Sequence, residues 1–282
     1  MSNYQYAKNI RYTAAGVAAV TGIYAVLFLV AFLCAGPFLW LLSTSFKANE
    51  NIYTLSLLPE RFSLDNYFGV FALLNIGRML MNSVIIAAGG VTLNALMGSL
   101  CAYPLAKMDF FGKKTINTAL VATMIIPAAA GLVVNYITIS RFHLRGNFLG
   151  VIIPNSVNVF SIILLRQAYL SIPKEMMDSA RIDGARELLI WRSIMLPQIL
   201  PTIATVVIMD FINKWNQFLW PLLVLNVDQY PVATGLKHIS GQFNYKFTNV
   251  AAGTVLSVIP VIIIFISFQK YYVNTTMGAL KG

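Results

Sequence analysis

The chain has 282 residues, of which 58% are hydrophobic and only 11% are charged, and its formal net charge at pH 7 is +10. Its mean hydropathy is +0.72. Soluble domains are roughly 45–50% apolar, so this composition excludes an ordinary soluble domain and predicts an integral membrane protein. The positive charge does not indicate a nucleic-acid partner, because no basic block is interleaved with aromatic residues.

The sequence contains few residues that support catalysis or metal binding. Cys34 and Cys101 both lie inside apolar runs, where a cysteine is typically a small buried residue, and there is no CxxC or Cys/His cluster. His143 and His238 fall on two different predicted loops. No HExxH, GxSxG or Walker A motif is present. We therefore expect no catalytic site, metal site or cofactor in this chain, and no ATP hydrolysis by the chain itself.

Long stretches without charged residues locate the expected membrane spans. A helix that crosses the roughly 30 Å hydrocarbon layer needs about 20 mostly uncharged residues. Five stretches meet this requirement, and a sixth is interrupted only by Asp210 and Lys214. The first span is too long for the apolar core of a cleaved signal peptide, so we expect it to be retained. We predict an all-α integral membrane protein with six transmembrane helices in a single permease domain, 1–282, with spans at about 14–42, 79–106, 115–139, 147–166, 197–224 and 248–269.

The distribution of lysine and arginine predicts the orientation of these spans. With a cytoplasmic N-terminus, most of the 20 basic residues fall on the cytoplasmic side, which agrees with the positive-inside rule. Arg141 and Arg145, on the outer side, run against it. This orientation predicts a multi-pass protein of the cell (inner) membrane with both termini in the cytoplasm. It also places a loop of residues 171–196 in the cytoplasm.

Two predicted outer loops, Lys47 to Ile76 and Asn226 to Lys246, are longer than the two to eight residues that usually join packed helices. They are interpreted either as surfaces for a partner or as solvated connectors.

The predicted cytoplasmic loop has a helical pattern of its own. Acidic and basic side chains both occur between Glu175 and Arg192, and central charges of this kind are costly in hydrocarbon, so the segment must lie in water. Apolar residues recur near helical spacing on both sides of Gly184. This pattern predicts two short helices with a break at Gly184, and a short helix presented from a loop is a docking element.

The same loop resembles the EAA loop of ATP-binding-cassette importer permeases. The resemblance rests on Asp178-Ser179-Ala180, Gly184 four positions later, and Ile194-Met195-Leu196-Pro197 after nine more residues. Two residues depart from the family pattern, since Asp178 replaces the usual Glu and Ser179 the usual first Ala. In that family the loop is the coupling helix that seats in a groove of the ATPase subunit. The resemblance thus implies coupling roles for Asp178, Ser179, Ala180, Arg181, Asp183, Gly184 and Ala185.

The interrupted sixth stretch is the second candidate site. Asp210 and Lys214 are four positions apart, so they share one helix face and are able to pair. Amides and indole rings surround them, and this combination suits a polyhydroxylated solute, because amides hydrogen-bond hydroxyls and indole faces stack on sugar rings. The alternative is a structural ion pair in an interfacial aromatic belt. The candidate solute pathway comprises Asp210, Asn213, Lys214, Trp215, Asn216 and Trp220, with Asn155 and Asn158 as weaker candidates.

Further motifs extend the resemblance to the second membrane subunit of maltose-type sugar importers. They are Ser43-Thr44-Ser45-Phe46-Lys47, Asn66-Tyr67, Ala102-Tyr103-Pro104-Leu105-Ala106, Trp215-Asn216 and Phe218-Leu219-Trp220-Pro221. The resemblance implies a six-span subunit that pairs with a homologous permease in a heterodimer. It also implies two ATPase subunits that bind ATP and Mg below, and an extracytoplasmic solute-binding protein above, contacted by residues 226–246. Sugar or oligosaccharide is the implied solute.

A different class of function stays open at this point. Asp210 inside a span is also compatible with an ion-coupled secondary carrier in which this carboxyl titrates. Such carriers usually contain inverted repeats and matching broken helices, and the sequence shows no such repeat. A membrane scaffold without transport activity is a third possibility.

Overall fold

The computed structural model describes residues 14–47, 56, 58–241 and 246–279. Apart from one isolated bridge between Lys47 and Phe62, the regular structure of these residues is helical. The chain divides into two compact units, one made of residues up to 70 with 246–255, the other of residues 71–245 with 256 onwards. Each unit is described by itself. The expectation of one permease domain over 1–282 stays a prediction.

The first unit contains the long apolar helix α2, Ala14–Ser45, the start of α3, Asp65–Leu74, and the first residues of α15, Phe247–Ala279. The Asn66 side-chain amide closes the turn after α2 by donating to the carbonyl oxygens of Ser45 (3.0 Å) and Lys47 (2.9 Å). Lys47 is fully buried, and its Nζ donates to both Ser56 oxygens at 2.8 Å. The expected outer loop 47–76 is therefore tied back to α2, while its residues 48–55 and 57 lie outside the described part.

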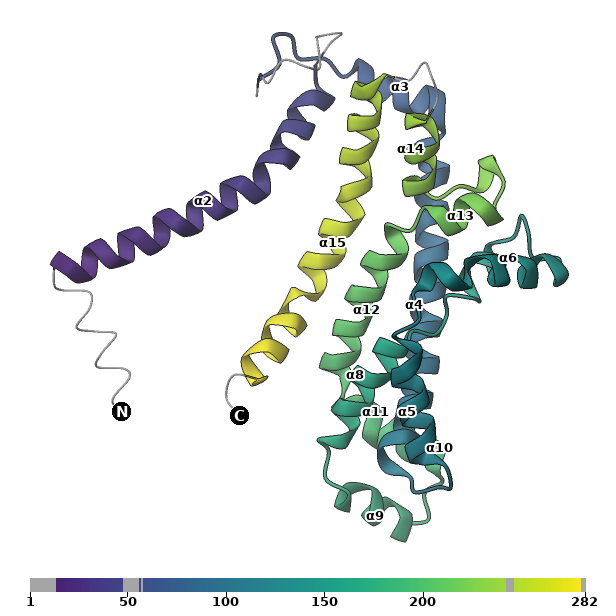
Figure 1. Ribbon diagram of the computed structural model, residues 1–282. Coiled ribbons are helices and arrows are strands. Elements are labelled where there is room, and N and C mark those ends of the chain that lie inside the picture. Colours follow the sequence, from purple (N-terminus) through teal and green to yellow (C-terminus); the bar gives the residue numbers. More distant parts are fainter. Residues whose placement is uncertain (1–13, 48–55, 57, 242–245, 280–282) are drawn as a thin grey trace. The chain divides into compact units, whose positions relative to one another are not determined.

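The second unit is built around α4, Ile76–Lys107, with α8, Val159–Leu170, and α12, Leu200–Trp215, packed along it (Figure 1). Small residues on α4 permit the close approach, as is common between helices in membranes. Polar side chains also cross the contact. Asn94 is fully buried, donates to Ser161 Oγ at 3.0 Å and accepts from the backbone N–H of Asn158 at 2.9 Å.

Two predicted spans are divided into shorter helices, which corrects the expectation of one helix for each. Span 115–139 contains α5, Lys113–Thr123, the 3-10 turn η1, Ala128–Gly131, and α6, Leu132–Arg141. Span 147–166 contains α7, Phe148–Ile152, and most of α8. Each break lies at a proline, Pro127 or Pro154. Proline lacks a backbone N–H and disfavours helical geometry in the residue before it, so a helix usually ends there.

The third difference concerns the predicted loop 171–196 and span 197–224. The chain continues from α9, Glu175–Ile182, through α10, Glu187–Ile190, the π-helix η2, Trp191–Met195, and α11, Leu196–Gln198. It then bends by 80° into α12. A second break at residues 216–218 separates α12 from α13, Leu219–Val224. Pro221 lies in the first turn of α13, where a missing N–H costs no intrahelical hydrogen bond.

By length and composition, three helices of the described chain are suited to cross a membrane, namely Gly16–Ser45, Ile76–Lys107 and Phe247–Phe268. The bent pair 187–198 and 200–215 raises the number to four if it forms one span. The membrane character of the fold is thus clear, whereas six spans stay a prediction.

The described part of the predicted outer loop 226–246 is largely helical, and residues 242–245 lie outside the described chain. It contains the turn η3, Val227–Gln229, and α14, Val232–Ser240, which packs on the first turns of α4. The Val232 N–H donates to Ser83 Oγ at 2.8 Å, and the Asn82 amide donates to the Tyr230 carbonyl at 3.3 Å. A Cβ on Gly235 would lie 2.4 Å from Met79 Sδ, so a larger residue here would displace the end of the Met79 side chain. α14 is thus fixed to one end of α4.

Candidate functional site

The predicted break at Gly184 in the loop of residues 171–196 is confirmed. α9 ends at Ile182, α10 begins at Glu187, and Gly184 between them has a φ of +79°. L side chains rarely adopt this left-handed conformation, whereas glycine does so at little cost. A Cβ at Gly184 would meet no atom within 4 Å. The backbone conformation, and not a lack of space, therefore favours glycine here.

α9 has one face in the core and one face in solvent. Met177 and Ala180 are 1% and 7% exposed and pack in a core that includes Tyr169 and Met195. The opposite face carries exposed Met176, Ser179, Ile182 and Asp183. The implied coupling residues consequently divide into two groups. Ala180 anchors the helix to its own chain, while Ser179 and Asp183 lie where another subunit has access.

An ion pair connects α9 to α10, and a hydrogen bond continues the connection to the end of α4. Arg181 Nη1 lies 3.1 Å from Asp178 Oδ1, and Arg181 Nε lies 2.9 Å from Glu187 Oε1. The second oxygen of Glu187 accepts a hydrogen bond from the Tyr103 hydroxyl at 2.8 Å. The hydrogen bond to Glu187 raises the pKa of the already basic Arg181 guanidinium. The segment α9–α10 is therefore joined to α4 through the Arg181–Glu187 ion pair and the Tyr103 hydroxyl.

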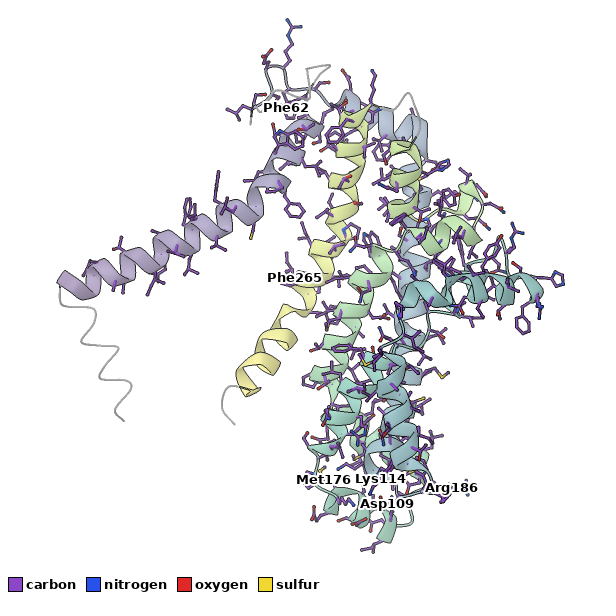
Figure 2. The ribbon with its side chains drawn as sticks, viewed as in Figure 1. Phe62, Asp109, Lys114, Met176, Arg186 and Phe265 are labelled. Carbon is purple, nitrogen blue, oxygen red and sulfur yellow. The ribbon has the colours of Figure 1, made fainter. Side chains whose placement is uncertain are left out.

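This end of the second unit is rich in charge. Figure 2 shows Asp109, Lys114, Met176 and Arg186 gathered around α9 and the end of α4. Lys107, the last residue of α4, is buried, and its Nζ donates to the Ile172 carbonyl. A hollow of about 440 Å³ lies here, lined by Lys107, Met108, Asp109, Lys174, Met177, Asp178, Arg181 and Glu187. Charges of both signs line it, so it favours neither anions nor cations.

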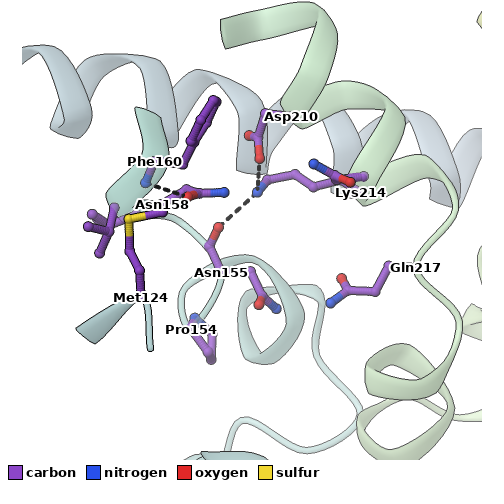
Figure 3. Close-up of a pocket in the computed structure, with 11 residues that line it drawn as sticks. Met124, Pro154, Asn155, Asn158, Phe160, Asp210, Lys214 and Gln217 are labelled. Carbon is purple, nitrogen blue, oxygen red and sulfur yellow. Dashed lines mark hydrogen bonds and ion pairs between the residues drawn. The ribbon is translucent and has the colours of Figure 1, made fainter. Parts of the chain in front are cut away.

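The second candidate site is a pocket of about 390 Å³ beside α12 (Figure 3). The break at Pro154 and the start of α8 form its other side. Five of the predicted pathway residues come together here: Asp210, Asn213, Lys214, Asn155 and Asn158. Gln217 and the apolar groups Met124, Pro154, Val157, Val159 and Phe160 complete the lining.

The predicted pairing of Asp210 with Lys214 is confirmed. Their side chains are only 5% and 9% exposed, and Lys214 Nζ lies 3.0 Å from Asp210 Oδ1. Lys214 Nζ also donates to the backbone carbonyl of Asn155 at 2.8 Å, so it links α12 to the Pro154 break. The other carboxylate oxygen, Asp210 Oδ2, is buried and has no hydrogen-bond partner among the residues that the structure describes.

Gly90 of α4 makes room for the Lys214 side chain. A Cβ at Gly90 would lie 2.4 Å from Lys214 Cε and 2.7 Å from Cδ. Because Nζ is held at both of its partners, the methylenes have no room to retreat without breaking those contacts.

We expect Gly90→Ala to lower the stability of the protein by about 1–3 kcal/mol, the usual cost of overpacking. Gly98→Ala is the matched control on the same helix. Its Cβ would meet Leu165 Cδ1 at 3.5 Å, an ordinary contact, and alanine is the better helix former by about 1 kcal/mol. Thermal unfolding of the purified protein in detergent measures the stability of both variants. Equal midpoints for the two variants would contradict the role of Gly90.

The structure does not bring the remaining predicted pathway residues to the pocket. Trp215 is 3% exposed, stacks on Phe211 and donates from Nε1 to the Ser257 carbonyl at 3.1 Å. Trp220 is 6% exposed and donates to the Gly150 carbonyl at 3.2 Å. Asn216 bonds the Ile212 carbonyl of its own helix at 2.9 Å. Both indoles are thus packing groups in this structure, and neither presents a face for stacking on a sugar ring.

Sequence reasoning did not single out several residues that the geometry brings forward. Glu187 and Tyr103 join the segment α9–α10 to α4. Met124 and Phe160 line the pocket beside α12. Pro154 was visible as a signal, because a proline in an apolar stretch beside two asparagines marks a break with exposed backbone.

Comparison with known proteins gives consistent matches. The model of the family "binding-protein-dependent transport system inner membrane component" matches residues 94–276. The arabinooligosaccharides transport system permease protein AraQ of Halalkalibacterium halodurans is 33% identical over 260 residues, which cover 90% of this chain and 93% of that protein.

A relative from Bacillus subtilis, the polygalacturonan/rhamnogalacturonan transport system permease protein YtcP, is 28% identical over 279 residues, which cover 92% of this chain and 97% of the relative. Among solved structures, a bacterial ABC transporter involved in the import of the acidic polysaccharide alginate has a chain with a TM-score of 0.80 and 24% identity. The match covers 93% of this chain and 99% of that one, so the two share a fold.

Proposed function

The chain belongs to the family of binding-protein-dependent transport system inner membrane components, and on that premise we propose that it is a permease subunit of an ATP-driven importer for a sugar or oligosaccharide. The observation that carries the proposal is the structure of residues 171–196, which we name the coupling loop. Within a chain that matches this family, a short helix with one buried and one exposed face is fixed to the longest helix of its unit.

The proposed solute class rests on two supports. Several relatives are named for saccharide transport, among them AraQ and the lactose transport system permease protein LacG of Rhizobium radiobacter. The pocket beside α12 is lined by amides and an ion pair next to an aromatic ring. Hydroxyl groups bond such amides, and the ring offers an apolar wall.

The proposed coupling path runs along α4. Ser83 accepts a hydrogen bond from the start of α14, and Tyr103 donates one to Glu187. The two residues are twenty positions apart on α4. This separation is about 30 Å along a helix and matches the thickness of the hydrocarbon layer. We place the α9 end in the cytoplasm, facing an ATPase subunit, and the α14 end outside, facing a solute-binding protein. A rigid helix fixed at both ends then transmits a displacement of either end to the other.

The remaining partners follow from this proposal. ATP and Mg are bound by two separate ATPase subunits, since this sequence contains no phosphate-binding loop. A homologous permease completes a heterodimer. The exposed apolar side chains of α2 contact lipid or that second permease. Both termini are placed in the cytoplasm, although residues 1–13 and 280–282 lie outside the described chain.

Uptake by the reconstituted complex tests the proposal. The chain is purified with its partner permease and ATPase subunits, placed in liposomes and supplied with the binding protein and a labelled oligosaccharide. We expect uptake that requires ATP and survives ionophores that collapse ion gradients. Uptake that continues without ATP and stops with the ionophore would instead assign the chain to ion-coupled carriers with Asp210 as the titrating group.

A further inference from the structure

We propose that the pocket beside α12 is a solute subsite selective for neutral, hydroxyl-rich molecules, in which a solute hydroxyl donates a hydrogen bond to Asp210 Oδ2. The inference rests on the proposed function and deepens it, because the named relatives include transporters of both neutral arabinooligosaccharides and acidic polygalacturonan. The structure thereby assigns a class of solute within that range.

The first observation is the unpartnered carboxylate oxygen. Asp210 is 4% exposed, and its Oδ2 has no hydrogen-bond partner among the described residues. A buried polar atom left unpaired costs about 1–3 kcal/mol, and more when it is charged. An ionised carboxylate oxygen only accepts hydrogen bonds. The group that satisfies Oδ2 must therefore be a hydrogen-bond donor, and a solute hydroxyl in the pocket is such a donor.

The second observation is the charge balance of the pocket. Asp210 and Lys214 are the only charged residues in its described lining, and they lie in direct contact. Their formal charges cancel. An anionic solute at Oδ2 would place a second negative charge beside the carboxylate, and a cationic one would meet the Lys214 ammonium. A neutral donor meets neither penalty.

The third observation concerns the hydrogen-bonding groups that remain. The Lys214 ammonium carries three N–H groups, of which two are used, by Asp210 Oδ1 and the Asn155 carbonyl. Among the described residues one N–H is thus left, on an ammonium that already contacts the same carboxylate through Oδ1. A hydroxyl that donates to Oδ2 and a neighbouring hydroxyl that accepts from Nζ would satisfy both atoms. A vicinal diol, as found in sugars, has this arrangement.

The fourth observation is that the pocket is polar along α12 and partly apolar on the opposite side. Asp210, Asn213 and Lys214 follow helical spacing, so they form one stripe of α12, and Gln217 follows in the break after that helix. Figure 3 shows the Lys214 Nζ between Asp210 and Asn155, with Phe160 and Met124 to one side. The volume of about 390 Å³ lies within the 300–1,000 Å³ common for small-molecule sites. Polar groups on one wall and a ring on another fit the two faces of a sugar.

Protection of an engineered thiol tests the subsite in the assembled importer. Asn213→Cys places a thiol in the lining, and Asn216→Cys, three positions later and exposed but outside the pocket, is the matched control. Both variants carry Cys34→Ser and Cys101→Ser, because the native cysteines are exposed. A maleimide labels the thiol in nanodiscs, with and without nucleotide, and the intact subunit is weighed by mass spectrometry.

Three neutral probes (lactose, arabinotriose and maltotriose) and one acidic probe (trigalacturonate) are added at millimolar concentration. We expect at least one neutral probe to slow labelling at position 213 at least about fivefold, with no effect at position 216 and none from trigalacturonate. Asp210→Asn is then added to the Asn213→Cys variant. The concentration of the neutral probe that halves the labelling rate, the half-protecting concentration, should rise about tenfold, because one charge-assisted hydrogen bond is weakened.

Absence of protection by every neutral probe, or equal protection by trigalacturonate, overturns the inference, and neither result depends on the folding of the Asp210 variant. An unchanged half-protecting concentration in Asp210→Asn overturns the role of Oδ2. The proposed function is tested separately by ATP-driven uptake in the unsubstituted complex. Intact uptake with no protection rejects the subsite alone, whereas loss of ATP dependence rejects the proposed function.

Discussion

Replacement of Gly184 by valine is expected to reduce ATP-driven uptake at least about tenfold while the subunit still inserts and assembles. Gly184 has a φ of +79° in open space, so valine meets no clash but must adopt a conformation that is a true outlier for a β-branched residue. Such backbone strain costs about 1–3 kcal/mol. Relief of this strain reorients α9 relative to α10 and removes its exposed face from the ATPase. Uptake and ATP hydrolysis, measured on the same liposomes, report the uncoupling.

Gly184→Asn is the matched control for this experiment. Asparagine adopts the left-handed region more readily than other non-glycine residues, so the turn survives, and uptake should stay within about threefold of the parent. Full uptake by Gly184→Val, or equal losses in both variants, would show that the left-handed turn does not position the coupling helix.

Removal of the carboxylate at position 210 is expected to have the largest effect on stability. Asp210→Leu leaves the Lys214 ammonium without its partner, on a side chain that is only 9% exposed. Breaking a buried pair from one side typically costs about 3–5 kcal/mol, and we expect a value near the lower limit because the ammonium borders a pocket. Thermal unfolding of the purified complex should show a clear decrease in its midpoint.

The double variant Asp210→Leu with Lys214→Met distinguishes the stability lost with the ion pair from the stability lost through altered packing. Replacement of both partners by apolar groups of similar size is often nearly neutral, so the double variant should regain most of the lost stability. Uptake should stay low in both variants, because the proposed subsite has lost its carboxylate. A double variant no more stable than the single one would mean that the pair is not the source of the destabilisation.

The sequence predicted best the elements that local physics determines. The charge-free stretch 79–106 corresponds to α4, Ile76–Lys107, and the stretch 14–42 to α2, Ala14–Ser45. The break at Gly184 and the pairing of Asp210 with Lys214 were also predicted correctly. In each case the cause lies within a few positions of the chain: uniform hydropathy, a residue that tolerates positive φ, or two charges one helical turn apart.

Features that depend on the rotation of helices against one another were not predicted. Trp215 and Trp220 are interfacial by residue type, yet both face the core of the second unit. Ala180 belongs to the motif by position but packs inward, and Arg181 reaches Glu187 across the Gly184 turn at a separation of six residues, outside helical spacing. The absence of charged residues also hid the breaks at Pro127 and Pro154, since no charge lies near either proline.

Site-specific crosslinking from the two faces of α9 tests the central claim most directly. A photoreactive amino acid is placed in turn at Ser179, Ile182 and Ala180 of the chain within the assembled importer. The account predicts crosslinks to an ATPase subunit from exposed Ser179 and Ile182, and crosslinks only within the permease from buried Ala180. If Ser179 and Ile182 crosslink to no ATPase, or are modified by a reagent confined to the outer side of the membrane, the coupling role of this loop is contradicted.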